Sequence, residues 1–488
     1  MALNWNRETI WLTDGGELDR SFHISEEAPV IGVERRAGRE VEGVESKPEE
    51  GQPAVVPAGA KQAGDIRARW AWVEPTVWTE RMLAALEQGV KGGKWFSLMD
   101  KVYALPNLRA AFAEVKANAG AAGVDRQTVK GFERHLEANL ERLAEQLKAG
   151  SYQPQAVRRQ WIDKAGSHEQ RPLGIPTVRD RVVQAAMRHA LEPIFERDFA
   201  AHSYGFRPGR GCKDALRRVV ELLRAGYRYV VDADLKSYFD TIPQAALMAE
   251  VKRKVADGRV LELTERYLKC SVLDGLEQWT PQEGTPQGAV LSPLLSNIYL
   301  DPLDHLMQEQ GYEMVRYADD FIILCRSEVE AQRALEQVQQ WTARAGLTLH
   351  PEKTRIVDAE APGGFDFLGY HFEHGQRWPR RKSLAKLKQS LREKTPRTHG
   401  QSLDRIIVDV NRTLQSWFAY FKHSRPRSFP PLDGWVRMRL RSILRKRHGR
   451  RGRGGGYDHR RWTNAYFVAH GLFSLATAHA TLCQSSRR

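Results

Sequence analysis

The chain has 488 residues and carries 75 Lys and Arg against 60 Asp and Glu, which gives a formal net charge of +15 at pH 7. With 41% hydrophobic and 28% charged residues, the composition excludes wholesale disorder, a collagen-like repeat and a small disulfide-stapled scaffold. The four cysteines show no metal-ligand or redox spacing, and no apolar run reaches the roughly 18 residues that span a bilayer. We therefore expect a soluble, intracellular protein with no membrane partner.

The N-terminal part divides into an acidic segment and a helical segment. Residues 1–65 are rich in Gly, Pro and Glu, and residues 1–50 hold 12 acidic and 6 basic side chains. This composition predicts a disordered extension. Helical spacing begins near Trp78, and a further helix is expected at residues 132–147, so residues 66–150 are predicted to form a helical N-terminal extension.

A mixed domain and a helical domain follow. Between residues 151 and 375, short strand-like runs alternate with helices and with Gly and Pro, which predicts a domain of helices and strands. After Arg380 the periodicity is purely helical, so residues 376–448 are predicted to form a helical domain, and residues 449–488 are predicted to form a basic tail.

Positive charge is concentrated towards the C-terminal end. Residues 376–488 hold 27 basic and 5 acidic side chains. Solvated helix faces are the alternative, but such faces usually mix both signs. The excess therefore favours a nucleic-acid-binding surface, whose affinity falls steeply with salt because each neutralised phosphate releases counterions.

Two adjacent carboxylates interrupt an apolar, β-prone segment at residues 314–324. Asp319 and Asp320 are expected at the tip of a hairpin, where their burial would be costly without a cation. The preceding strand-like run alternates so that Asp232 and Asp234 share one face, and the period alone does not choose between them. Three carboxylates from two strands can hold two Mg²⁺ ions about 3.5–4 Å apart, which suits nucleotidyl transfer; an exposed acidic turn is the alternative.

Four longer motifs resemble one protein family. YGFRPGRG (204–211), DLKSYFD (234–240), GTPQGAVLSPLLSNIYLDPLD (284–304) and YADD (317–320) are similar to motifs of bacterial group II intron-encoded reverse transcriptase/maturase proteins. The resemblance implies an α+β fold: a right-hand polymerase with an antiparallel sheet in its fingers and palm, then an all-α thumb (maturase domain X) and a short basic tail. The sequence has none of the Cys pairs typical of an HNH module, and in this it resembles the endonuclease-lacking members of the family.

The resemblance also implies a metal site. Asp234, Asp319 and Asp320 match the catalytic triad, and the backbone carbonyl of Leu235 is expected as a further ligand of two Mg²⁺ ions. By the same resemblance Asp232 is a structural residue.

Five residues match the nucleotide pocket of the family. Lys164 and Arg171 would hold the triphosphate, as a point charge and a bidentate fork. Phe239 matches the gate that excludes a ribose 2′-hydroxyl, with core packing as the alternative. Gln287 would line the pocket, and Lys353 matches a lysine proposed to protonate the departing pyrophosphate, with an ordinary surface lysine as the alternative.

The remaining assignments concern nucleic acid. The hairpin expected to grip the primer end consists of Phe367, Leu368, Gly369 and Tyr370. Arg207 and Arg210 are expected to shape the template track, although a plain turn would look similar. The thumb residues expected to contact RNA phosphates are Arg437, Arg441, Arg445, Lys446 and Arg447.

By this resemblance the chain is an RNA-directed DNA polymerase and a maturase. It would bind group II intron RNA, assist splicing, and use dNTPs to copy an RNA template from a DNA primer at the target DNA. It would lie in the bacterial cytoplasm and associate with the nucleoid when bound to target DNA. The alternatives are a splicing-only, RNA-binding maturase and a repurposed bacterial reverse transcriptase in phage defence; the oligomeric state is not predicted.

Overall fold

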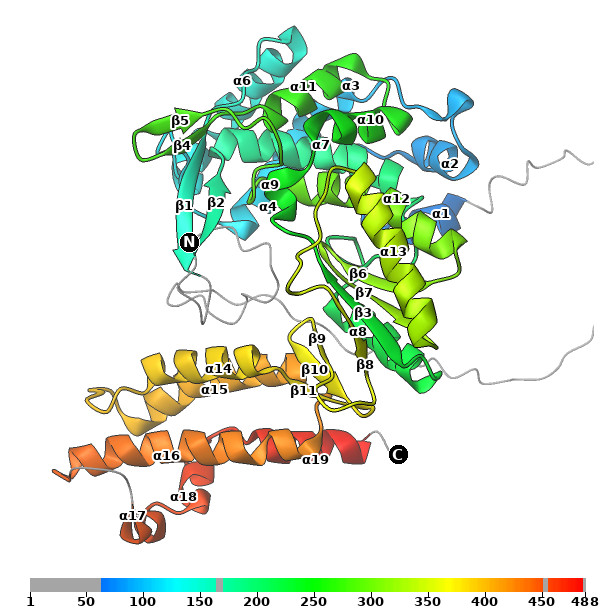
Figure 1. Cartoon of the computed structure of the whole chain (residues 1–488). Helices are drawn as coiled ribbons and strands as arrows, with labels where there is room; N and C mark the ends of the chain where they lie inside the picture. Colours follow the sequence, from blue (N-terminus) through cyan, green and yellow to red (C-terminus); the bar gives the residue numbers. More distant parts are fainter. Residues whose placement is uncertain (1–62, 164–169, 451–454, 486–488) are drawn as a thin grey trace, which may run out of the picture.

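The computed structural model of the chain describes residues 63–163, 170–450 and 455–485. The extension predicted to be disordered lies almost entirely outside these residues, and so does Lys164. The described elements form fingers at the top of Figure 1, a palm beneath them and a helical thumb at the bottom. None of the helices in the described ranges combines the length and apolarity needed to cross a membrane.

The fingers combine a four-stranded sheet with helices. The strand order is β2-β1-β4-β5, and β1 and β2 form an antiparallel hairpin. The strands are β1 (Val157–Asp163), β2 (Gln170–Ile175), β4 (Val272–Asp274) and β5 (Glu277–Trp279). The helices that precede the sheet are α1 (Ala63–Arg69), α2 (Glu80–Gln88), η3 (Lys91–Gly93), α3 (Met99–Val102), α4 (Leu105–Asn118), α5 (Val129–Glu133) and α6 (Leu136–Ala149).

The single helix expected at residues 132–147 is wrong in detail, because the chain leaves helical geometry at His135 (φ −126°, ψ 40°) and α5 and α6 are separate. The core helix of the region is α7 (Val178–Glu196), which packs against α4. Three further helices, α9 (Tyr238–Thr241), α10 (Gln244–Lys254) and α11 (Gly258–Leu268), join the fingers to the palm.

The palm is an antiparallel sheet between two hydrophobic cores. Its order is β6-β7-β3-β8, and its strands are β3 (Tyr229–Asp234), β6 (Glu313–Tyr317), β7 (Asp320–Cys325) and β8 (Arg355–Asp358). Alternate residues of each strand face opposite cores, so Phe321 and Ile323 pack with α12 (Ser292–Glu309) and α13 (Glu328–Arg344). Ile322 and Leu324 pack on the other side with α8 (Cys212–Arg224). The predicted antiparallel sheet is confirmed for the palm, whereas the fingers sheet is mixed, because β1 and β4 pair in parallel.

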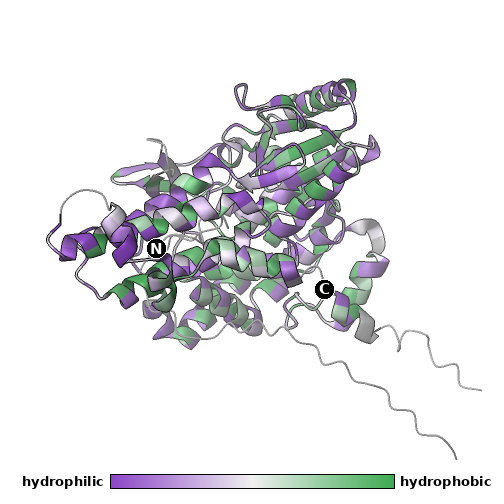
Figure 2. Cartoon of the chain, turned by 90° about the horizontal axis from the view of Figure 1, so that it is seen from below, coloured by the Kyte–Doolittle hydropathy of each residue, from purple (hydrophilic) through white to green (hydrophobic). Residues whose placement is uncertain are grey.

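The thumb begins with a small sheet and continues as packed helices. Its strands are β9 (Phe365–Phe367), β10 (Tyr370–Glu373) and β11 (Gln376–Pro379), and its helices are α14 (Arg381–Lys394), α15 (Leu403–Phe421), η4 (Pro426–Ser428), α16 (Pro430–Arg447), α17 (Gly456–Arg461), α18 (Asn464–Ala469) and α19 (Leu475–Ser485). Hydrophobic and hydrophilic residues mix along these helices, as amphipathic packing requires (Figure 2).

The C-terminal helix packs against the thumb. The buried carboxylate of Asp433 on α16 accepts hydrogen bonds from Ser474 Oγ (2.8 Å) and from the backbone nitrogens of Leu475 (2.9 Å) and Ala476 (3.0 Å). A carboxylate at a helix N-terminus satisfies amide donors that the helix itself leaves unpaired. The segment predicted as a basic tail therefore continues the thumb core in its described part.

Candidate active site

Strand register brings the predicted catalytic carboxylates to one end of the palm sheet. Asp234 at the end of β3 lies directly opposite Asp320 at the start of β7. Tyr317 of β6 also pairs with Asp320, so Ala318 and Asp319 form a two-residue hairpin turn. Ala318 has φ +60°, a conformation that this tight turn demands of a residue with a side chain.

Asp232 and Asp234 share a face of β3 but have different neighbours. Asp232 lies opposite Ile322 and Arg355, and Arg355 Nε is 3.6 Å from its Oδ2. Burial raises the pKa of Asp232 to about 6, against the opposing effect of Arg355. Asp232 is thus enclosed by the sheet, whereas Asp234 reaches its end.

The loop after α13 lies alongside Asp234. Lys353 Nζ is 2.5 Å from Asp234 Oδ2, and His350 N donates to Asp234 O (2.7 Å). No three His, Cys, Asp or Glu side chains within the described ranges stand close enough together to hold one metal ion. The donor set still fits Mg²⁺, which binds through one or two carboxylates and completes its shell with water and substrate phosphates. In this structure the Lys353 ammonium is the cation paired with Asp234.

Two predicted pocket residues meet at the junction of fingers and palm. Phe239 and Gln287 both line a pocket of about 230 Å³ between the fingers sheet and residues 281–287. Gln287 Nε2 donates to Asp240 Oδ2 (3.0 Å), and Gly174 N of β2 donates to Gln287 O (2.6 Å). The side chain of Arg171 is not described, so it and Lys164 remain predictions.

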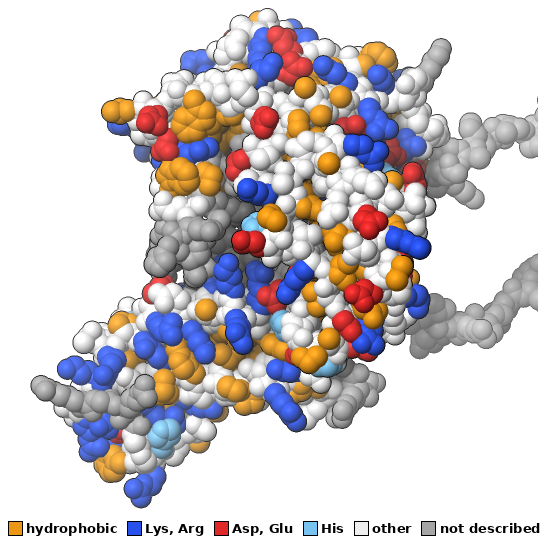
Figure 3. Space-filling view, viewed as in Figure 1, with side chains coloured by type: hydrophobic (Ala, Val, Ile, Leu, Met, Phe, Trp, Pro, Cys, Tyr) orange, Lys and Arg blue, Asp and Glu red, His pale blue; other side chains and the backbone are white. Residues whose placement is uncertain are grey.

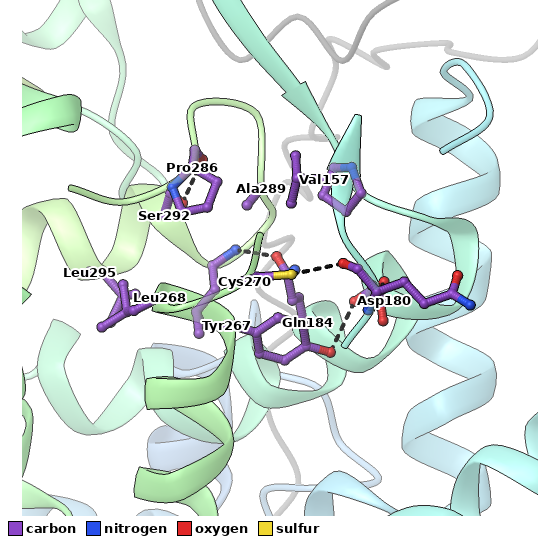
Figure 4. Close-up of a pocket in the computed structure, with 13 residues that line it drawn as sticks. Val157, Asp180, Gln184, Tyr267, Leu268, Cys270, Pro286, Ala289, Ser292 and Leu295 are labelled. Carbon is purple, nitrogen blue, oxygen red and sulfur yellow. Dashed lines mark hydrogen bonds between the residues drawn. The ribbon is translucent and has the colours of Figure 1, made fainter. Parts of the chain in front are cut away.

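Hydrogen bonds anchor the loop between Gln287 and α12, and Figure 4 shows Gln184, Pro286 and Ser292 at this loop. Gln184 of α7 accepts hydrogen bonds from Val290 N (2.8 Å) and Leu291 N (3.3 Å) through Oε1. Ser292 Oγ donates to Pro286 O (2.9 Å). These contacts tie the loop to the start of α12 and to the fingers core.

The hairpin expected to grip the primer has buried side chains. Phe367, Leu368 and Tyr370 are each exposed by 4% or less. Tyr370 Oη donates to Tyr420 O, and Tyr420 Oη donates to Leu368 O, both at 2.7 Å. The aromatic groups thus attach the hairpin to α15, and the primer grip stays a prediction.

Two of the arginines expected at nucleic acid hold the fold together. The Arg207 side chain, 2% exposed, pairs with Glu196 (2.7 Å) and donates to Ser203 O (2.8 Å). Arg441 donates to Trp462 O (2.8 Å) and Asn464 Oδ1 (3.0 Å). Burial of a guanidinium is stable only when its donors are paired, so neither group is available to a phosphate without breaking these bonds.

The other predicted basic residues divide by exposure. Arg445 pairs with the buried Asp458, and Arg447 donates to His399 O (3.2 Å) while remaining exposed. Lys446 is exposed, and Arg210 and Arg437 are half-buried. Figure 3 shows Lys and Arg side chains gathered over the thumb, including the part that borders the hollow beneath the fingers.

A residue that the sequence analysis did not select lies beside the catalytic turn. Arg316 on β6 is completely buried and bonds to Asp304 and Asn297 on α12 and to Ala318 O. In the sequence it is an arginine between Val315 and Tyr317, and its side-chain partners Asp304 and Asn297 come from another element, α12.

Comparison with known proteins agrees with these features. Residues 162–372 match the family described as reverse transcriptase (RNA-dependent DNA polymerase), and residues 384–462 match the group II intron, maturase-specific domain. The chain is 32% identical over 346 residues to protein YkfC of Escherichia coli K12, covering 62% of this chain and 85% of YkfC.

Two further proteins are similar over a smaller share of this chain. The group II intron-encoded protein LtrA of Lactococcus lactis subsp. cremoris is 39% identical over 196 residues, covering 40% of this chain and 32% of LtrA. A solved partial Cas6-RT-Cas1–Cas2 complex aligns with 51% of this chain and 41% of its own, at 26% identity and a TM-score of 0.34. The chain thus spans about a third of LtrA and less than half of that structure.

The two matched domains imply nucleic-acid substrates, and reverse transcriptases generally use divalent metal ions. The polymerase motifs lie on the palm and fingers, and the maturase-specific match lies on the thumb helices. The chain belongs to the group II intron-encoded reverse transcriptase/maturase family, whose enzymatic activity is RNA-directed DNA polymerisation.

Proposed function

We propose that this chain copies RNA into DNA by two-metal-ion nucleotidyl transfer at Asp234, Asp319 and Asp320. The observation that carries the proposal is the register of β3 and β7, which places Asp234 opposite Asp320 and beside the turn that holds Asp319. When bound, two Mg²⁺ ions would activate the primer 3′-hydroxyl and neutralise charge on the leaving pyrophosphate.

The Leu235 carbonyl suits a role as a further ligand. Asp234 O and Lys236 N bond to residues 350 and 348 on one side of the chain. Because carbonyl groups alternate along an extended segment, the Leu235 carbonyl would point to the opposite side, towards β7.

Lys353 would change partner during the reaction. Its ammonium neutralises Asp234 at 2.5 Å and is 60% exposed, so it can leave that carboxylate without breaking a packed core. Released from Asp234, it would hold a proton for the departing pyrophosphate. Phe239 would lie against the ribose, Gln287 would line the pocket, and Lys164 and Arg171 would hold the triphosphate.

The thumb would bind the RNA partner of this polymerase. We infer that its exposed basic residues bind group II intron RNA, that this assists splicing, and that the bound protein then copies the intron RNA from a primer at target DNA. Phosphate and shape contacts of this kind stabilise an RNA fold and leave the splicing chemistry to the RNA.

Primer extension tests the polymerase directly. The purified protein is given a DNA-primed RNA template, Mg²⁺ and dNTPs, beside Asp319→Ala. Full-length cDNA from the wild type and none from the variant would support the proposal. No product from the wild type, despite tight binding of intron RNA, would favour a splicing-only maturase.

A further inference from the structure

The catalytic turn rests on a buried charged network. Arg316 is two residues before Ala318 and is 0% exposed, as is Asp304 on α12, while Asn297 on the same helix is 1% exposed. A buried guanidinium is strongly unfavourable unless its donors are paired. Each described contact of the Arg316 guanidinium leads either to α12 or to the turn.

The Arg316 guanidinium bonds both to helix α12 and to the turn. Arg316 Nε donates to Asp304 Oδ1 (2.7 Å) and Nη2 donates to Asp304 Oδ2 (2.5 Å), a bidentate pair that fixes the plane of the guanidinium. Nη1 then donates to Asn297 Oδ1 (2.9 Å) and to Ala318 O (2.9 Å). The carbonyl of Ala318 belongs to the peptide bond that leads into Asp319.

The preceding peptide, between Tyr317 and Ala318, is packed closely against Gly205 on a second side. A Cβ built on Gly205 would lie 2.2 Å from Ala318 N, so only glycine permits this approach. Asn297 Nδ2 donates to Gly205 O (2.8 Å), and Tyr204 N donates to Arg316 O (2.8 Å). Asn297 therefore joins both supports of the turn through its two amide atoms.

This enclosure explains how Ala318 keeps an unfavourable conformation. A non-glycine residue at positive φ is strained and persists only where its surroundings fix it. The direction of the Asp319 side chain depends on that backbone. Metal sites lose affinity when the residues that orient their ligands are removed, because the ligands no longer sit in one geometry.

We propose that Arg316, together with Asp304 and Asn297, is a positioning residue that fixes the Ala318–Asp319 turn so that Asp319 and Asp234 bind divalent cations in one defined geometry. The inference rests on the proposed two-metal function. Arg316 touches no substrate; it acts through the Ala318 carbonyl.

A double substitution separates positioning from stability. Arg316→Met alone would leave the Asp304 carboxylate buried and unpaired, and the protein could then fail to fold. Arg316→Met with Asp304→Leu removes both charges, and such apolar replacements of buried ion pairs are often neutral for stability. Gly205→Ala disturbs the turn from the other side, and Glu313→Gln, which removes a surface ion pair of β6 with Arg218, serves as the control.

Two readouts are measured on the full chain. Mn²⁺ binding is followed by electron paramagnetic resonance with primer–template bound, and primer extension is titrated with Mg²⁺. The double variant should have a melting temperature within a few degrees of the wild type. It should nevertheless need at least about tenfold more Mn²⁺ for half-maximal binding and at least about tenfold more Mg²⁺ for half-maximal primer extension. Gly205→Ala should show the same increase in both ion concentrations. Glu313→Gln should need the wild-type concentration.

The outcomes distinguish this inference from the proposed function. A double variant with wild-type ion dependence would overturn the positioning role, and so would a loss of melting temperature with unchanged ion dependence in Gly205→Ala. If the wild type itself makes no cDNA, the polymerase proposal fails; the Mn²⁺ affinities then still decide whether the network orders the carboxylates.

Discussion

The palm strand β3 and the thumb helix α16 each carry two like charges on one face, and in both places the two charges have different surroundings. On β3, Asp232 is enclosed opposite Arg355, whereas Asp234 lies opposite Asp320 at the end of the sheet. On α16, Arg441 is buried against Trp462 O, whereas Arg437 has no ion pair with any described residue. Periodicity assigns a face, and the neighbouring element decides whether the charge supports the fold or is available for function.

The largest effect is expected from the two aspartates of β3. Asp234→Asn should lower single-turnover primer extension roughly 10³-fold or more, because it removes a proposed metal ligand and several kcal/mol of transition-state stabilisation. Asp232→Asn should stay within about tenfold of the wild type, because this side chain lies beside Arg355 and opposite Ile322, away from the Asp234–Asp320 pair. Equal losses in both variants would contradict the separation of roles.

The same pair shows how far the sequence can be read. The α+β fold and the hairpin at Asp319 were predictable, because alternation and the YADD motif are local in the chain. Strand periodicity alone did not choose between Asp232 and Asp234; the family resemblance favoured Asp234, and the register with β7, more than 80 residues later in the sequence, places Asp234 opposite Asp320. Arg316 was missed and Arg441 was assigned to RNA for the same reason: their partners come from other elements, and no local pattern encodes them.

On α16, stability should separate the two arginines. Arg441→Ala leaves Trp462 O and Asn464 Oδ1 without their donor and should lower the free energy of unfolding by about 2–4 kcal/mol. Arg437→Ala should stay within about 0.5 kcal/mol of the wild type. Urea unfolding of both variants measures the difference, and an unchanged Arg441→Ala would show that this guanidinium is dispensable to the thumb.

Helix α7 extends the comparison to acidic residues. Glu196 is paired closely with Arg207, while Glu192, one turn earlier, lies 3.6 Å from Arg188. Burial raises the pKa of Glu192 to about 7, although Arg188 opposes this. The folded state therefore binds a proton that the unfolded chain, with a pKa near 4.5, releases, so stability should fall as the pH rises from 4.5 to 7.

Glu192→Gln should remove this part of the pH dependence. Relative to the wild type, the variant should gain about 1–3 kcal/mol of unfolding free energy between pH 4.5 and 7, and no more above that range. Urea unfolding at four pH values measures the slope, with Glu145→Gln on the exposed face of α6 as the control. A variant that follows the wild-type slope would mean that Glu192 is ionised in the fold at little cost.

The smallest expected effect concerns two basic residues of α16, the exposed Lys446 and the half-buried Arg437. Lys446→Ala and Arg437→Ala should each weaken intron RNA binding by about three- to tenfold at low salt. Each should also reduce the slope of log K against log salt by a little under one, because one phosphate contact and its released counterion are lost. Arg333→Ala on α13, an exposed arginine of the palm, should change neither value.

If both thumb variants keep the wild-type slope, the positive charge of α16 does not lie at the RNA, and the exposed charges of the other thumb helices must make the phosphate contacts. If only Arg437→Ala keeps it, the contact lies at the C-terminal end of α16, where Lys446 and Arg447 are exposed.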